Sequence, residues 1–202
     1  MSNRDWILVV EDAASEAVLR RMFADLAPAW TVALVDNCGG ATPMRSKLPR
    51  YRNASHVLPH LLLTDLDNAD CASALMAAWG VVSEPPRLLF RVAVREVEAW
   101  LMGDRAGTAA WLQVPGAKVP LQAEAQPDPK QTLLALGRAS KSRRLRAEFC
   151  PAPGSSASQG PLYNEHIKRF VRQDWNLAAA RATVPSLDRA CRRISELAEA
   201  AA

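Results

Sequence analysis

The sequence predicts an α/β fold, a mostly parallel sheet flanked by helices over residues 1–104, followed by a helical extension over residues 105–202 packed on it. Three observations predict this fold. Short apolar runs of strand length alternate with helical patterns in the first half. Most of these runs end directly in acidic or turn-forming residues, and strand signals stop after Asp104. Strand, helix and strand in this order imply a right-handed βαβ unit, whose strands are parallel.

The first half opens with the apolar run Trp6–Val10, which predicts a buried strand because it is continuous and rich in β-branched residues. A helix is expected from Ser15 to Leu26, where apolar residues recur at helical spacing before Pro28. Residues 30–35 predict a second strand. Residues 42–56 are basic and weakly patterned, so we expect a loop and a short helix there.

A third strand is predicted at Leu61–Leu63, whose consecutive leucines indicate burial on both faces. A helix is expected over Cys71–Trp79, ending at Gly80. Residues 87–94 predict another buried strand, which runs directly into a helix that carries Val97 and Leu101 on one face.

The second half lacks strand patterns and contains helices joined by loops. Prolines make residues 113–129 linker-like, and the composition of residues 151–160 indicates a flexible loop. Ser186 is the expected N-cap of the last helix. Helices are expected at residues 131–136 and 141–149, with two or three more over residues 163–202.

Composition indicates a globular protein of the cytoplasm. The 202 residues are 49% hydrophobic and 23% charged, and we find neither a membrane-spanning run nor a signal peptide. The four cysteines are far apart and the chain has three histidines, so we expect free thiols and no zinc site. The net charge of +4 permits an anionic partner without requiring one.

Carboxylates follow three of the predicted strands. Glu11 follows the first, Asp65 and Asp67 the third, and Glu96 and Glu98 the last. Because the carboxyl ends of parallel strands share one edge, we expect these groups to lie together, where they would repel each other without a cation. Hard oxygen ligands favour Mg²⁺ or Mn²⁺. Each group also has an ordinary explanation, as a turn residue or as an acid in a helix's first turn.

The strand before Glu11 and the later Asp65-Leu66-Asp67 together resemble the Toprim domain, which topoisomerases, bacterial primases, recombination-repair proteins and the overcoming-lysogenization-defect nucleases share. The segments Val10–Glu16 and Arg95–Asp104, with the tail Val184–Leu187, more narrowly resemble stand-alone, RloB-related bacterial Toprim-like proteins. The resemblance covers most of residues 6–104 and fragments of the tail.

This resemblance implies Mg²⁺-dependent chemistry on phosphodiesters, in defence or DNA maintenance. Glu11 would match the glutamate that acts as general acid or base, and Asp65 and Asp67 the metal-binding pair, with Glu96 or Glu98 as further ligands. Asp12 stands where many Toprim domains have glycine. If nucleic acid is the partner, the candidate phosphate contacts are Arg45, Lys47, Arg50, Arg52, Lys141, Arg143, Arg144 and Arg146.

Three alternatives remain open. A signalling receiver domain would use Asp65 as phosphoacceptor, but Arg95-Glu96 stands where its fourth strand should end in Thr or Ser. A haloacid-dehalogenase-type phosphatase would use Asp65-Leu66-Asp67, although that motif normally opens the first strand. The third is a non-catalytic, Toprim-shaped adaptor that binds nucleotide or a partner ATPase.

Overall fold

The computed structural model describes residues 4–81, 85 and 87–200, and confirms the α/β class. The described residues form a four-stranded sheet in the order β2-β1-β3-β4, in which every neighbouring pair is parallel. The two central strands are the first and third in sequence, so their carboxyl ends lie side by side. The strands are β1 (Asp5–Val10), β2 (Thr31–Asn37), β3 (His60–Asp65) and β4 (Leu88–Ala93).

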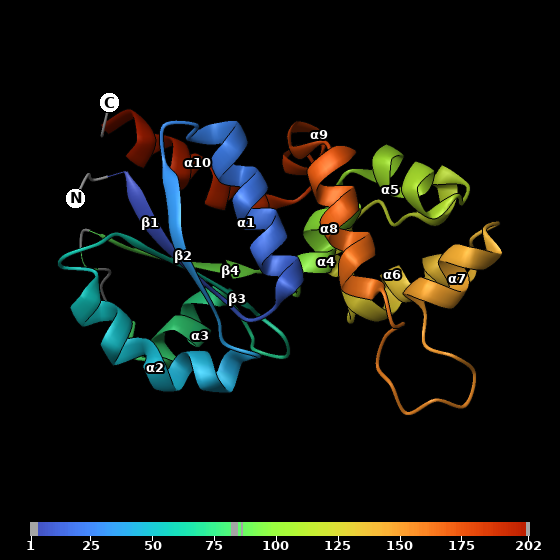
Figure 1. The fold of residues 1–202 in the computed structure, drawn as a ribbon, viewed down its shortest axis with the longest axis horizontal. Helices are drawn as coiled ribbons and strands as arrows, with labels where there is room; N and C mark the ends of the chain where they lie inside the picture. Colours follow the sequence, from blue (N-terminus) through green and yellow to red (C-terminus); the bar gives the residue numbers. More distant parts are fainter. Residues whose placement is uncertain (1–3, 82–84, 86, 201–202) are drawn as a thin grey trace.

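Helices cover both faces of the sheet (Figure 1). On one face lie α1 (Ala13–Leu26) and the last helix, α10 (Pro185–Ala200); on the other lie α2 (Ala41–Ala54) and α3 (Ala72–Ala78). Residues of β1 alternate between the two cores: Leu8 and Val10 belong to the first, and Val9 to the second. This alternation is what a pleated strand buried on both faces produces.

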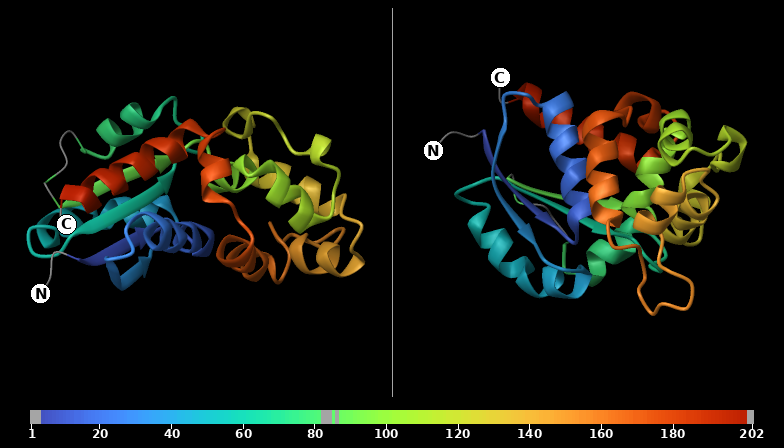
Figure 2. Two further views of the ribbon diagram at one scale, coloured as in Figure 1. Left: turned by 90° about the horizontal axis from the view of Figure 1, so that it is seen from above. Right: turned by 45° about the vertical axis from the view of Figure 1, so that its right-hand side comes forward.

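The remaining helices form a lobe beside the sheet, toward which the carboxyl ends of the strands point (Figures 1 and 2). Apolar side chains of this lobe join those of the α1 and α10 face in one continuous core. The lobe holds α4 (Val97–Gly103), α5 (Arg105–Leu112), η1 (Gly116–Lys118), η2 (Ala123–Ala125), α6 (Pro129–Arg138), α7 (Arg143–Phe149), α8 (Tyr163–Gln173) and α9 (Leu177–Arg181). None of the described helices is both long and apolar enough to cross a membrane.

The expectation of a loop and a short helix over residues 42–56 was wrong, because α2 is a continuous helix of 14 residues. Met44, Leu48 and Tyr51 are its buried residues, and they recur at the spacing of one helical face. The many basic residues between them obscured this pattern. Pro49 lies inside the helix without ending it.

Trp100, in α4, connects the lobe to the last helix. It is completely buried, and its indole Nε1 donates a hydrogen bond to the Ser186 hydroxyl at 2.7 Å. Ser186 was predicted as the N-cap of the last helix, but α10 begins at Pro185, so Ser186 lies within its first turn. Its backbone amide donates instead to Glu124 Oε1, at 2.7 Å. The chain after Asp104 therefore returns to cover the sheet, and the boundary at that residue stays a prediction.

Candidate functional site

Glu11 lies immediately after β1 and reaches across the end of β3. Its Oε1 accepts hydrogen bonds from the Thr64 hydroxyl and from the backbone amide of Asp65, the latter at 2.9 Å. Parallel pairing of β1 with β3 brings these residues together, since Val10 pairs with Leu63. One carboxylate oxygen of Glu11 is thus fixed at the junction of the two central strands.

Asp65 is the last residue of β3, and its carboxylate points toward the start of α4. Its Oδ1 accepts a hydrogen bond from the backbone amide of Val97 at 3.0 Å. A carboxylate that receives the free amide of a helix start is locally favourable. Glu11 and Asp65 therefore link the ends of β1 and β3 to the start of α4.

Asp67 lies two residues beyond β3 and is exposed. Its φ of +48° is in the left-handed region, which Asp tolerates better than most residues. Its backbone amide donates to the Arg95 carbonyl at 3.0 Å, and its carbonyl accepts from Arg95 Nη1 at 2.8 Å. These bonds hold the backbone and leave the Asp67 carboxylate open to solvent.

Glu96 and Glu98 are engaged with the helical lobe. Glu96 Oε2 accepts a hydrogen bond from the Lys130 amide at 2.7 Å, in the first turn of α6. Glu98 is buried, and its Oε1 accepts from the Tyr163 hydroxyl at 2.8 Å. Both side chains thus have protein partners away from Glu11, although they follow the neighbouring strand end.

The carboxylates nevertheless act on one another electrostatically. Burial raises the pKa of Asp65 well above its usual range, and the charges of Glu98, Glu11, Asp12 and Asp67 raise it further. Burial also raises the pKa of Glu11, with Asp67 and Asp12 adding to the effect, against the hydrogen bonds from Thr64 and Asp65, which lower it.

Glu96 and Glu98 also have raised pKa values. Burial raises the pKa of Glu96, to which Asp128 and Asp67 add. Burial, with the charge of Asp12, raises the pKa of Glu98 to about 7. Like charges gathered in this way are stabilised by protons or by a cation.

A pocket of about 420 Å³ opens at this edge of the sheet. Three of its lining residues are the carboxylates Glu11, Asp12 and Asp65. Asn37, at the end of β2, and Asn164, in the first turn of α8, complete its polar lining; neither was among the candidates drawn from the sequence. The position of Asn37 at a strand end was a usable signal, whereas Asn164 comes from α8, which is distant in sequence from all the strands.

The donor chemistry of this edge suits Mg²⁺, but the ligands are not gathered around one point. Among the residues that the structure describes, no three Asp, Glu, His or Cys side chains are placed to hold a metal ion together. Mg²⁺ usually keeps several waters and binds proteins through one or two carboxylates and the substrate's phosphates. Glu11 and Asp65 line one pocket, and their carboxylates are of the oxygen-donor type that such a site uses, so the donor chemistry of the residues present fits the ion.

Asp12 has a local structural role. Its side chain accepts a hydrogen bond from the Ser15 amide at 2.8 Å and so caps α1. An N-cap of this kind typically stabilises a helix by about 1 kcal/mol. The acid at a position where many Toprim domains have glycine is therefore explained by the helix that follows it.

Most of the basic residues proposed for phosphate contact already have protein partners. Arg45 and Arg52 donate from α2 to the carbonyls of Ala78 and Gly80, and Lys47 pairs with Asp36 at 3.1 Å. In the lobe, Arg144 pairs with Glu148 at 2.7 Å and Arg146 donates to the Ser140 carbonyl. The exposed residues Arg50, Lys141 and Arg143 complete the set. Phosphate binding by these residues stays a prediction.

Two alternatives fit the sheet poorly. A receiver domain needs a fifth strand that ends in lysine, and the described ranges 4–81 and 87–200 contain no strand beyond β4. A haloacid-dehalogenase-type motif belongs on the first strand, whereas Asp65 ends the third in sequence.

No protein-family model matches the chain, and comparison with curated proteins finds no match. Among solved structures, the chain is similar to the C-terminal region of the Burkholderia pseudomallei OLD protein. The two share 12% sequence identity and a TM-score of 0.49, over 96% of this chain and 98% of the other. A likeness at this level assigns no activity.

Proposed function

We propose that this protein is a Toprim-like, Mg²⁺- or Mn²⁺-dependent phosphodiesterase that acts on nucleic acid. The observation that supports the proposal most is the hydrogen bond from the Asp65 amide to Glu11, because it joins the proposed general acid or base to a proposed metal ligand. The resemblance of the strand–Glu11 and Asp65-Leu66-Asp67 segments to Toprim domains supports the same chemistry.

In this proposal Asp65 and Asp67 hold the cation, which, when bound, stabilises charge on a phosphoryl oxygen. Glu11 holds a proton at the oxygen that Thr64 does not occupy. Its raised pKa brings it closer to neutral pH, where a general acid or base works best. Glu96 and Glu98 have hydrogen-bond partners in the lobe. In this proposal they act mainly through the electrostatic effect of their carboxylates on the neighbouring acids.

A cleavage assay tests the proposal. Labelled DNA and RNA oligonucleotides are incubated with Mg²⁺ or Mn²⁺ and with wild-type protein or Asp65→Asn, which keeps the size of the side chain and removes its charge. We expect cleavage by the wild type and a loss of at least about 10²-fold in the variant.

Asp70→Asn is the matched control, because it makes the same chemical change on an exposed acid five positions away. It should retain cleavage within about twofold, since exposed substitutions rarely perturb the protein. Equal losses in the two variants, or no cleavage by the wild type with either metal, contradict the proposal.

A non-catalytic adaptor is the second candidate. The absence of a three-ligand metal group among the described residues favours it, as does the use of Asp12 to cap a helix. It predicts that the wild type binds nucleotide or a partner ATPase and cleaves neither labelled probe in the presence of either metal.

A further inference from the structure

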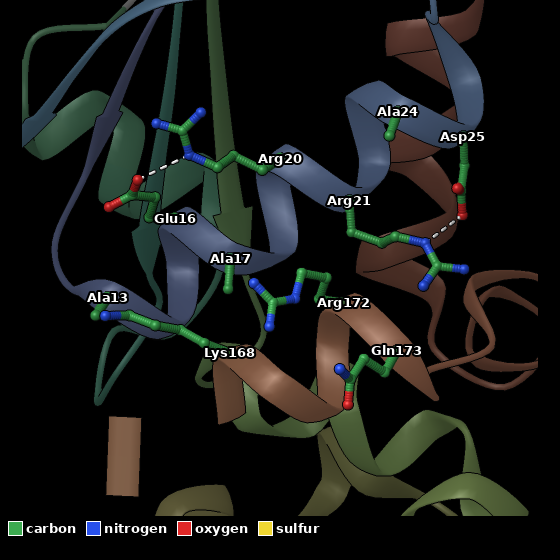
Figure 3. A pocket seen from close by; sticks show the side chains of 10 residues that line it. All are labelled: Ala13, Glu16, Ala17, Arg20, Arg21, Ala24, Asp25, Lys168, Arg172 and Gln173. Atoms are coloured by element: carbon green, nitrogen blue, oxygen red, sulfur yellow. Dashed lines mark hydrogen bonds and ion pairs between the residues drawn. The ribbon is translucent and has the colours of Figure 1, made fainter. Parts of the chain in front are cut away.

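A groove of about 710 Å³ lies between α1 and α8 and adjoins the candidate site (Figure 3). Ala13, the first residue of α1, lines both this groove and the pocket that contains Glu11 and Asp65. The groove therefore begins where the candidate site ends, and it runs along α1 toward Asp25.

The groove is formed by small residues and long charged ones. Ala13, Ala17 and Ala24 present methyl groups on the α1 side, which leaves space between the two helices. Of the described residues that line the groove, four are cationic and two acidic, and none is aromatic. The cations are Arg20, Arg21, Lys168 and Arg172, and the acids are Glu16 and Asp25.

Two of these cations are held by contacts within the protein. Arg20 pairs with Glu16 at 2.8 Å. Arg21 pairs with Asp25 at 2.8 Å and also donates to the Val171 carbonyl at 3.0 Å, which ties α1 to α8. We assign Arg21 to this packing contact.

Lys168 and Arg172 are the cations available to a ligand. They lie one helical turn apart on α8 and are both exposed. Lys168 has a weak surface pair with Glu165 at 2.9 Å, and Arg172 makes no ion pair with any residue in the described part of the chain. In Figure 3 the Lys168 side chain extends toward Ala13, and the Arg172 guanidinium faces α1. Exposed pairs of this kind exchange readily for a stronger anion.

We propose that the α1–α8 groove binds the sugar–phosphate backbone of a nucleic acid through Lys168 and Arg172 and leads it to the Glu11–Asp65 edge. The identity of the ligand rests on the proposed function, and the groove itself rests on its shape and charge. Because its lining holds cations but no aromatic rings for base stacking, the groove contacts phosphates and reads no sequence.

A second basic pocket, of about 420 Å³, provides a comparison surface. Arg189, Arg192 and Arg193 line it from α10, and none of them is a candidate phosphate contact. It shares no lining residue with the candidate site or with the α1–α8 groove. A double variant in this pocket therefore serves as the control, because it loses the same number of cations as the groove variant.

The test measures binding without cleavage, in EDTA, by the fluorescence anisotropy of a labelled 20-base-pair duplex and of its single strand. Affinity is measured between 50 and 200 mM salt for the wild type, for Lys168→Gln/Arg172→Gln, and for Arg189→Gln/Arg193→Gln. All four side chains are exposed, so the fold is expected to tolerate both changes.

We expect the groove variant to bind about tenfold more weakly at 50 mM salt. Its plot of log affinity against log salt should be shallower by about 1.8 for the duplex and by about 1.4 for the single strand, as expected when two phosphate contacts are lost. The control variant should keep the wild-type slope.

An unchanged slope in the groove variant, an equal change in the control, or no binding by the wild type would each overturn the inference. Failure of the proposed function gives a different pattern. In that case the wild type binds through the groove in EDTA, with the predicted change in slope, but cleaves neither probe when metal is added.

Discussion

The carboxylate of Glu11 accepts a hydrogen bond from the backbone amide of Asp65, at 2.9 Å, and so joins residues 54 positions apart in sequence. The bond spans the two central strands at their carboxyl ends, the usual ligand-binding edge of an open α/β sheet. It keeps the Asp65 carboxylate, which is turned toward α4, within the electrostatic influence of Glu11.

Glu98→Gln should stabilise the metal-free protein at pH 8. The pKa of Glu98 is raised from 4.5 to about 7, so the folded state binds this proton more tightly than the unfolded state. Wild-type stability should therefore fall as the pH rises from about 4.5 to about 7, by on the order of 2–3 kcal/mol. Gln can still accept the Tyr163 hydroxyl and does not ionise, so the variant should exceed the wild type at pH 8 and approach it near pH 5.

Urea unfolding at the two pH values measures this difference. Glu165→Gln is the control, because its carboxylate is exposed on α8, and it should change stability by less than about 0.5 kcal/mol at either pH. A Glu98→Gln variant that is less stable than the wild type at pH 8 would mean that an ionised Glu98 supports the fold.

Mg²⁺ should stabilise the wild type more at pH 8 than at pH 5.5, because protons compete with the cation for the carboxylates whose pKa is raised. At an ion concentration ten times the Kd, the gain is about 1.4 kcal/mol, or roughly 3–5 °C in Tm for a chain of this size. Thermal unfolding with and without the ion, at matched ionic strength, measures it. An equal shift in Asp65→Asn would show that the ion binds elsewhere.

Ser186→Ala should destabilise the protein by about 1–3 kcal/mol. The substitution leaves the buried indole Nε1 of Trp100 without its acceptor, and it also removes the acceptor of the Val94 amide. Ser46→Ala is the matched control, because the Ser46 hydroxyl is exposed and bonds only to the nearby Pro43 carbonyl. Equal changes in the free energy of unfolding would mean that the Trp100 contact adds nothing.

Gly103→Ala should destabilise the junction between α4 and the chain around Val184. A Cβ at residue 103 would lie 2.4 Å from Val184 Cγ2 and 3.0 Å from the Ala180 carbonyl oxygen. Overpacking of this kind costs about 1–3 kcal/mol. At Gly116 a Cβ meets nothing within 4 Å, so Gly116→Ala should be nearly neutral in the same chemical-denaturation experiment. If the two variants have the same free energy of unfolding, Val184 and Ala180 do not approach Gly103 closely.

Sequence patterns predicted β1, β3 and β4 well because these strands are largely buried on both faces and therefore appear as continuous apolar runs, as at Leu61–Leu63. They failed for α2, where basic residues separate the three buried positions. The convergence of Glu11 on Asp65 followed from parallel topology alone, since neighbouring parallel strands end at one edge.

The directions of side chains were beyond the sequence patterns. Glu96 and Glu98 follow a strand as Asp65 does, but their carboxylates meet Lys130 and Tyr163, which come from distant helices. The α1–α8 groove was missed for the same reason. Lys168 and Arg172 repeat one turn apart within a segment predicted only to be helical, and it is the packing of α8 against α1 that places them in one groove.

A crystal structure of the wild type with Mn²⁺ at pH 8 would show whether Asp65 binds a divalent cation. We predict anomalous density beside the Asp65 carboxylate, shared with Asp67 or Glu11, at roughly the 2.1 Å expected for Mg²⁺-type coordination. The density should be absent in Asp65→Asn crystals grown under the same conditions. Mn²⁺ bound only at other carboxylates, or unchanged density in the variant, would contradict this prediction.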